Sequence, residues 1–95
     1  MPYIKQEQRK ELEDFVTLLG QKLLENGPDN MGEYNYVITK LIHDYIYFNG
    51  LKYSNLNNIV GMLECAKAEF IRKVVSPYEE KKIKENGSVS QLDRE

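Results

Sequence analysis

Cysteine, histidine and tryptophan are almost missing from this chain, and their scarcity excludes several kinds of site. The 95 residues contain one cysteine, Cys65, one histidine, His43, and no tryptophan. A single cysteine cannot form a disulfide within the chain, and one cysteine with one histidine cannot supply the four ligands of a structural zinc site. We therefore expect no metal and no cofactor, and a cytoplasmic location.

Long apolar runs and clusters of basic residues are missing as well. The opening MPYIKQEQRKE lacks the apolar segment of a secretory signal peptide, and no run approaches the ~20 apolar residues of a membrane-spanning helix. The 13 basic and 15 acidic residues are interspersed and give a net charge of −2, which argues against a broad contact with duplex nucleic acid. We expect neither a membrane nor nucleic acid as a partner.

Apolar residues at helical spacing account for most of the chain. They predict helices over about Gln6–Glu25, Met31–Phe48, Ser54–Tyr78 and Pro77–Glu85. Asn30 with Glu33 resembles a capping box, either Ser54 or Asn55 can cap the third helix, and Ser76 before Pro77 is typical of a helix start. The predicted fold is an all-α bundle of three main helices plus a short C-terminal helix, assembled as a symmetric homo-oligomer, with one domain over residues 1–87 and a flexible tail over 88–95.

Each of the three long helices has an apolar face that we expect to form the core. The predicted core residues are Leu12, Phe15, Val16, Leu19 and Leu23 in the first helix, Tyr34, Val37, Ile38, Leu41, Ile42, Tyr45 and Phe48 in the second, and Leu56, Ile59, Val60, Leu63, Ala66, Phe70 and Val74 in the third.

The opposite side of the third helix is unusual, because small residues stand where a solvated helix would carry charges. We call Asn58, Gly61, Cys65 and Ala68 the small-residue seam; Arg72 lies at its end. Glycine inside a helix costs about 0.5 to 1 kcal/mol relative to alanine, so it suggests the close approach of another group. That group is a neighbouring helix of the same chain, a second copy across a two-fold axis, or a ligand. In all three cases the seam predicts that Cys65 is buried.

The second helix carries a further stripe on the side away from its core face. We call Tyr36, Lys40, His43 and Tyr47 the tyrosine stripe. Aromatic rings stack on a nucleobase while a lysine and a protonatable histidine contact phosphate, so the stripe suits a nucleotide or a single strand. The alternative is that the tyrosines pack against a partner subunit and the charges are solvated.

Three residues outside the stripe complete the predicted ligand-binding set. Tyr53 offers another ring for stacking. Lys67 projects close to the middle of the third helix's apolar face, so it either extends to solvent or meets a carboxylate or phosphate. Arg72 offers a planar fork for a phosphate, or pairs with Glu69 or Glu79.

Four segments resemble an uncharacterised family of short proteins from bacteria, archaea and their phages. They are the opening MPYI, YNYVITKLIHDY, GMLECAKAEFIRKVVSPYE and KKIKENG, and they span nearly the whole chain. The resemblance implies a helical fold and a phage or mobile-element setting, in which case the protein would act in the host cytoplasm. It implies no activity and no catalytic residue.

No catalytic motif is present either. A nucleophilic Cys65 would need a nearby base or a positive environment, and the seam predicts that it is buried instead. Adjacent His43 and Asp44 diverge by ~100° on a helix, so they form no catalytic pair. We therefore predict a non-enzymatic protein that binds a small anionic ligand, such as a sponge that sequesters a nucleotide signal of host defence. The alternative is a protein-interaction module, an inhibitor or adaptor acting on a host protein. An enzyme whose site is assembled from two chains stays open.

Overall fold

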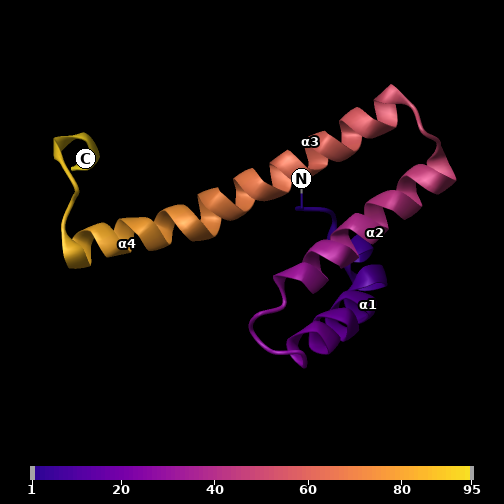
Figure 1. The fold of residues 1–95 in the computed structure, drawn as a ribbon, viewed down its shortest axis with the longest axis horizontal. Coiled ribbons are helices and arrows are strands. Elements are labelled where there is room, and N and C mark those ends of the chain that lie inside the picture. The colour runs from indigo at the N-terminus through magenta and orange to yellow at the C-terminus, as the bar shows by residue number, and fades with distance from the viewer. Residues whose placement is uncertain (1, 95) are drawn as a thin grey trace. The chain divides into compact units, whose positions relative to one another are not determined.

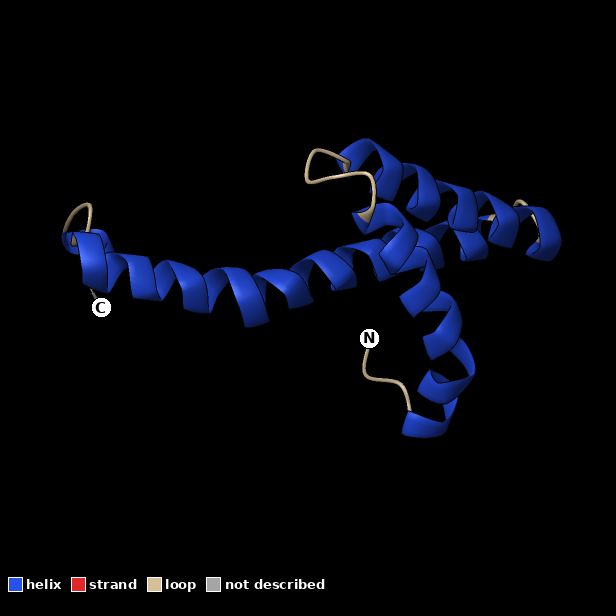
Figure 2. Cartoon of the chain, turned by 90° about the horizontal axis from the view of Figure 1, so that it is seen from below, coloured by secondary structure: helices blue, strands red, loops and turns tan. Residues whose placement is uncertain are grey.

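The computed structural model describes residues 2–94, and every regular element in that range is helical. The α-helices are α1 (Gln6–Leu24), α2 (Met31–Asn49), α3 (Tyr53–Phe70) and α4 (Ser76–Asn86), labelled in Figure 1. A π-helix, Ile71–Val75, joins α3 to α4, and a short 3-10 helix, Gln91–Asp93, follows. Figure 2 shows helices and loops without a strand over the described residues. The predicted all-α class is confirmed.

The chain divides into two compact units, which are residues 2–60 and residues 61–94 within the described range. The first unit contains α1, α2 and the start of α3, and the second contains the rest of α3, the π-helix, α4 and the 3-10 helix. The predicted outer limits of the domain and of the tail, Met1 and Glu95, lie outside the described residues.

A buried asparagine closes the loop between α1 and α2. The Nδ2 atom of Asn30 donates a hydrogen bond to the carbonyl oxygen of Leu23 over 2.6 Å, and Asn26 donates to the carboxylate of Glu33 over 2.7 Å. The capping box predicted from Asn30 and Glu33 is therefore wrong, because Asn30 makes no side-chain cap hydrogen bond to α2. Asn30 instead ties the loop to the end of α1, and Glu33, in α2, accepts its hydrogen bond from Asn26 in the loop.

A second buried asparagine closes the turn between α2 and α3. Asn55 donates from Nδ2 to the carbonyl oxygens of Asn49 (3.1 Å) and Gly50 (2.9 Å). Gly50 has a φ of 111°, which only glycine adopts readily, and ends α2 as the sequence predicts. The expectation that Ser54 or Asn55 caps α3 is wrong, because α3 already begins at Tyr53. Asn55 satisfies carbonyl groups at the end of α2 instead.

A π-turn takes the place of the predicted helix start at Ser76. Pro77 has no N–H for the carbonyl of Lys73, and its ring would crowd that carbonyl in an α-helix. The helix widens just before the proline, and the N–H of Ser76 bonds to the carbonyl of Ile71, five residues back. Ser76 itself has helical φ and ψ of −62° and −47°, so it is not the extended cap that the sequence suggests. The ribbon passes from α3 into α4 without a break (Figure 1).

The segment after α4 forms a capped turn. The carboxylate of Asp93 accepts hydrogen bonds from the N–H groups of Val89 and Ser90, both over 3.0 Å, and the hydroxyl of Ser90 accepts one from the N–H of Leu92. These backbone hydrogen bonds, that from Val89 above all, lower the pKa of Asp93 below its ordinary value because they favour the ionised form.

Most of the predicted core faces are uncovered. Leu23, at the end of α1, is the one buried apolar side chain among the described residues, whereas Phe15 is 74% exposed and Phe70 is 60% exposed. A helix buries its apolar stripe only against a second layer. Within residues 61–94 the long helix is accompanied by no other element than the 3-10 helix, so its stripe stays open. The helical pattern is correctly predicted, but the burial is not.

Candidate functional site

The first unit has an open hollow of about 980 Å³ at the C-terminal half of α2. Most of its wall is apolar, and three residues of the tyrosine stripe take part in it. Its lining consists of Lys40, Ile42, His43, Asp44, Ile46, Tyr47, Phe48, Gly50, Leu51 and Leu56. The hollow exists because Asn55 and Gly50 turn the chain sharply, which brings Leu51 and Leu56 next to the end of α2.

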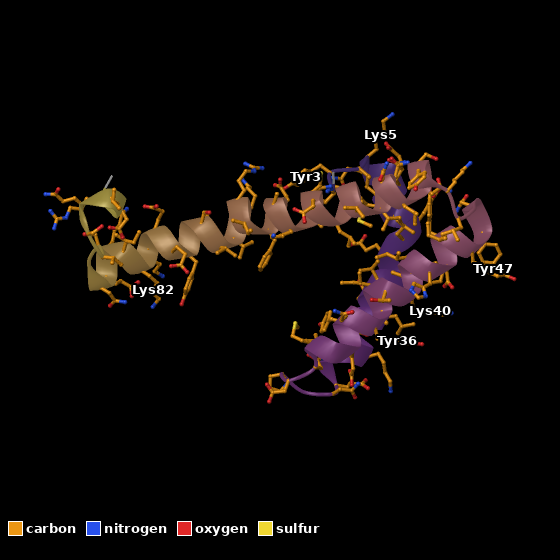
Figure 3. All side chains as sticks on the ribbon, turned by 45° about the horizontal axis from the view of Figure 1, so that its top comes forward. Tyr3, Lys5, Tyr36, Lys40, Tyr47 and Lys82 are labelled. Carbon is orange, nitrogen blue, oxygen red and sulfur yellow. The ribbon has the colours of Figure 1, made fainter. Side chains whose placement is uncertain are left out.

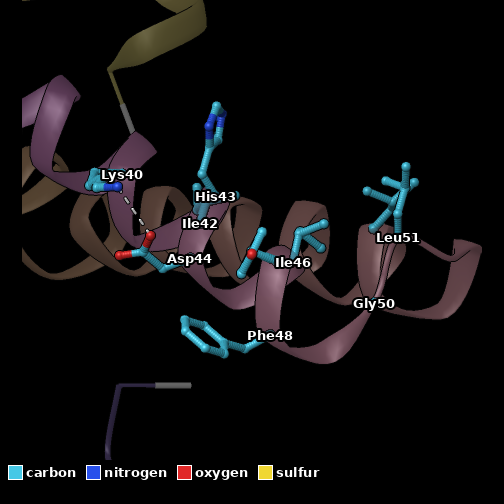
Figure 4. A pocket seen from close by; sticks show the side chains of 10 residues that line it. Lys40, Ile42, His43, Asp44, Ile46, Phe48, Gly50 and Leu51 are labelled. Atoms are coloured by element: carbon cyan, nitrogen blue, oxygen red, sulfur yellow. Dashed lines mark ion pairs between the residues drawn. The ribbon is translucent and has the colours of Figure 1, made fainter.

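The charged edge of the hollow is an ion pair within α2. The Nζ atom of Lys40 lies 3.3 Å from a carboxylate oxygen of Asp44, one turn later, and both side chains are about half exposed. Figure 4 shows this pair at one end of the hollow and Leu51 at the other, with His43 extending away from the pair. An exposed pair at this spacing contributes only about 0.3 to 0.5 kcal/mol, so Lys40 can exchange Asp44 for another anion at small cost.

The tyrosines of the predicted site are accessible. Tyr36, Lys40 and Tyr47 lie along one side of α2 (Figure 3). Tyr47 is 83% exposed and packs edge-on against Phe48, with ring centroids 5.3 Å apart and an angle of 82° between the rings. Tyr36, one helical turn before Lys40, and Tyr53, at the start of α3, are also exposed but do not line the hollow. Of the five predicted ligand-binding residues in this unit, Lys40, His43 and Tyr47 thus line the hollow, and Tyr36 and Tyr53 do not.

The remaining two ligand-binding candidates belong to residues 61–94. Arg72 forms an ion pair with Glu69, with Nη2 and Oε1 2.7 Å apart. The sequence predicts an ion pair of Arg72 with Glu69 or Glu79, and the pair with Glu69 is confirmed. Lys67 is exposed on α3.

The small-residue seam faces open space. Asn58, Gly61, Cys65 and Ala68 are all exposed, and a Cβ atom built on Gly61 meets no atom within 4 Å. The predicted burial of Cys65 is therefore wrong, because nothing among the described residues covers this side of α3.

No metal site or buried titratable group accompanies the hollow. Residues 2–94 contain no cluster of three or more histidine, cysteine, aspartate or glutamate side chains that could hold a metal ion. None of the helices in that range combines the length and apolarity needed to cross a bilayer.

Sequence reasoning missed the role of several lining residues. The sequence predicts Phe48 in the core, yet Phe48 is 81% exposed and lines the hollow. Asp44 was considered only as a neighbour of His43, although its four-residue distance from Lys40 is the usual spacing of a helical ion pair. That spacing could have identified Asp44; no local signal identifies Leu51 and Leu56.

The fold and the hollow define a small all-helical protein with an accessible aromatic and apolar surface. Residues 1–89 match the family described as a domain of unknown function (DUF6899), and the chain belongs to that family. The expected membership of a family without an assigned activity is thereby confirmed. No curated protein and no solved structure matches the chain.

Proposed function

We propose that this protein is a non-enzymatic binding protein for a small anionic ligand with an aromatic part, of which a nucleotide is the best example. The observation that carries the proposal is that Lys40, His43 and Tyr47, chosen from the sequence as one functional stripe, line the same open hollow. Such a combination of an apolar wall with a few polar groups is typical of small-molecule sites.

The chemistry of the hollow fits the two halves of a nucleotide. A base stacked on Tyr47 gains roughly 1 to 3 kcal/mol, the range found for stacking on aromatic side chains. A phosphate contacts Lys40, which leaves its weak pair with Asp44, and an imidazole N–H of His43 adds a second donor. Tyr36 and Tyr53 are exposed in the same unit but lie outside the lining of the hollow. Lys67 and Arg72 stay separate predictions of phosphate-binding residues in the second unit.

Calorimetric titration of the purified chain tests this proposal. The probes are ATP and a cyclic dinucleotide, with adenosine and inorganic phosphate as the separate halves. We expect a nucleotide to bind at least about tenfold more tightly than either half, since both contacts are then made together. Lys40→Ala should weaken nucleotide binding by about 10- to 100-fold, because a hydrogen bond to a charged group contributes about 1.5 to 3 kcal/mol.

Lys22→Ala is the matched control, because Lys22 is also an exposed helical lysine paired with a carboxylate, Glu25, over 3.5 Å. It removes the same charge at a distance from the hollow and should leave binding unchanged. Equal effects of the two variants would show that any binding is unspecific charge attraction. Unchanged uptake in a chain carrying both Lys40→Ala and Arg72→Ala would refute the whole set of phosphate contacts.

Sequestration is the biological form of this proposal: the protein would hold a nucleotide signal of host defence without altering it. The support is the resemblance to proteins of phages, which is an association rather than a physical argument. Native mass spectrometry of freshly purified protein should show a retained ligand. Ligand released by denaturation should have its original mass after prolonged incubation; a changed mass would mean that the chain is an enzyme.

The alternative is a protein-interaction module, and a specific observation favours it. Tyr47, Phe48 and Leu51 are 83%, 81% and 80% exposed, and all three line the hollow. A surface that gathers exposed aromatic and aliphatic side chains is typical of a protein-binding site. A Phe48→Ser variant that binds nucleotide normally but no longer co-precipitates a host protein would support this alternative against the first.

We also propose that the chain assembles as a symmetric homo-oligomer, because its apolar faces are open and the small-residue seam has no neighbour. The support is the exposure of Gly61 and Cys65 on one side of α3 and of Phe70 on another. Native mass spectrometry reports subunit number in the same measurement as retained ligand. A monomer at all concentrations up to about 100 µM would refute this part without affecting the ligand proposal.

A further inference from the structure

The apolar face of α3 carries a second regular line of residues, on the side opposite the small-residue seam. Leu56, Val60, Leu63, Lys67, Phe70 and Val74 follow one another at distances of four, three, four, three and four residues. This alternation is the spacing of a two-helix coiled coil, in which each seam residue packs against a second helix. We call Val60, Leu63, Lys67 and Phe70 the apolar seam; all four are exposed on α3.

Lys67 constrains what can cover the apolar seam. A purely apolar partner would leave this ammonium group buried without a counter-charge, which is costly. The nearest acidic side chain on the same helix is Glu64, which flanks the seam three residues earlier and takes part in no ion pair described for this structure. A second copy of α3 that runs antiparallel to the first would bring its own Lys67 and Glu64 to the same place, so that the charges of both residues are neutralised.

Antiparallel pairing of two copies meets this requirement. With the two-fold axis at the level of Cys65, Leu63 lies two residues before the axis and faces Lys67, two residues after it, in the second copy. Val60 and Phe70 lie five residues before and after the axis and face each other likewise. The Glu64 and Lys67 side chains of both copies then gather on the axis, two positive and two negative.

Parallel pairing does not meet the requirement. It would place the two Lys67 side chains opposite each other, each next to Ala66 of the second copy, whereas Glu64 lies on the other flank of the seam. Like charges facing each other are destabilising.

We propose that the apolar seam of α3 is a homodimer interface in which two copies pair in antiparallel orientation, held in register by a neutral cluster of Glu64 and Lys67 from both chains. This inference rests on the self-association proposed above and assigns it to one face and one direction; it does not depend on ligand binding. Cys65 lies on the opposite side of α3 and stays accessible in this dimer.

Charge reversal at the apolar seam tests the inference by analytical ultracentrifugation of the full chain between about 1 and 100 µM. Lys67→Glu places four negative charges on the axis and should raise the dimer dissociation constant at least about tenfold. The double variant Glu64→Lys with Lys67→Glu restores a neutral cluster and should return the constant to within about threefold of the parent. Lys81→Glu, an exposed lysine on α4 away from the apolar seam, is the control and should change little.

The possible results separate the claims. A parent chain that is monomeric throughout refutes self-association as a whole. A dimer that tolerates Lys67→Glu but is weakened by Phe70→Ser refutes the antiparallel register. A dimer that tolerates both variants and is cross-linked through Cys65 by a short bis-maleimide assigns the interface to the small-residue seam and overturns this inference. Because Lys67→Glu could impair folding itself, rescue by the double variant, with helicity checked by circular dichroism, is the decisive observation.

Discussion

The turn between α2 and α3 should depend on one side chain, that of Asn55. Its amide donates two hydrogen bonds, to the carbonyl oxygens of Asn49 and Gly50, and the residue is buried. Replacement by alanine removes both bonds. Because a typical hydrogen bond contributes about 0.5 to 1.5 kcal/mol, Asn55→Ala should lower the free energy of unfolding by about 1 to 3 kcal/mol.

Thermal unfolding followed by circular dichroism measures this effect. For a domain of this size 1 kcal/mol corresponds to about 4 to 8 °C, so Tm should fall by roughly 5 to 20 °C. Protein concentration must be the same in every sample, because self-association would itself shift Tm. Asn55→Asp should be more harmful than Asn55→Ala, since it replaces the donor with a carboxylate facing two carbonyl oxygens.

Asn57→Ala is the matched control, because Asn57 is exposed on the same helix and alanine gives both variants the same gain in helix propensity. The difference between the two variants then reports the two hydrogen bonds alone. If Asn55→Ala and Asn57→Ala unfolded within about 2 °C of each other, Asn55 would not hold the turn, and the account of the hollow's wall would be wrong.

Three further predictions concern other local features. Gly50→Ala should lower the free energy of unfolding in urea by about 1 to 3 kcal/mol, because a φ of 111° is strained for any residue with a side chain. The added Cβ itself would make only an ordinary contact, so an unchanged free energy of unfolding would refute the strain. Pro77→Ala should convert the π-turn to an α-helix and raise Tm in thermal unfolding, because alanine restores the backbone N–H that proline lacks; a lower Tm would contradict this account of the π-turn. The pKa of Asp93 is lowered by folding, so the carboxylate stabilises the C-terminal turn above about pH 4 and this contribution is lost as the pH falls through the folded pKa. The amide shifts of Val89 and Ser90 should follow that titration in NMR, and shifts that ignore it would contradict the hydrogen bonds.

The helices were predictable because the information for them is local. The breaks at Gly27–Pro28 and at Gly50 follow from the backbone preferences of glycine and proline. The same local reasoning failed where a side chain had two possible partners. Asn30 and Asn55 are both good helix caps by composition, and both instead bond to carbonyl groups of the preceding helix.

The candidate site was predictable only in part. The spacing of Tyr36, Lys40, His43 and Tyr47 places them on one face of any helix, and it required no tertiary information. That Leu51 and Leu56 complete a wall beside His43 and Tyr47 depends on the direction of the chain after Gly50, which no periodicity specifies.

By itself the sequence determined the helical class, the places where α1 and α2 end, and two lines of residues, the tyrosine stripe and the apolar seam, because these depend on contacts within a few residues. Only the tertiary structure decided that the apolar faces are open, that Cys65 is accessible and that Pro77 is accommodated by a π-turn within a continuous helix. The physical reason is that periodicity shows which side of a helix is apolar, whereas burial depends on whether another layer is there to cover it.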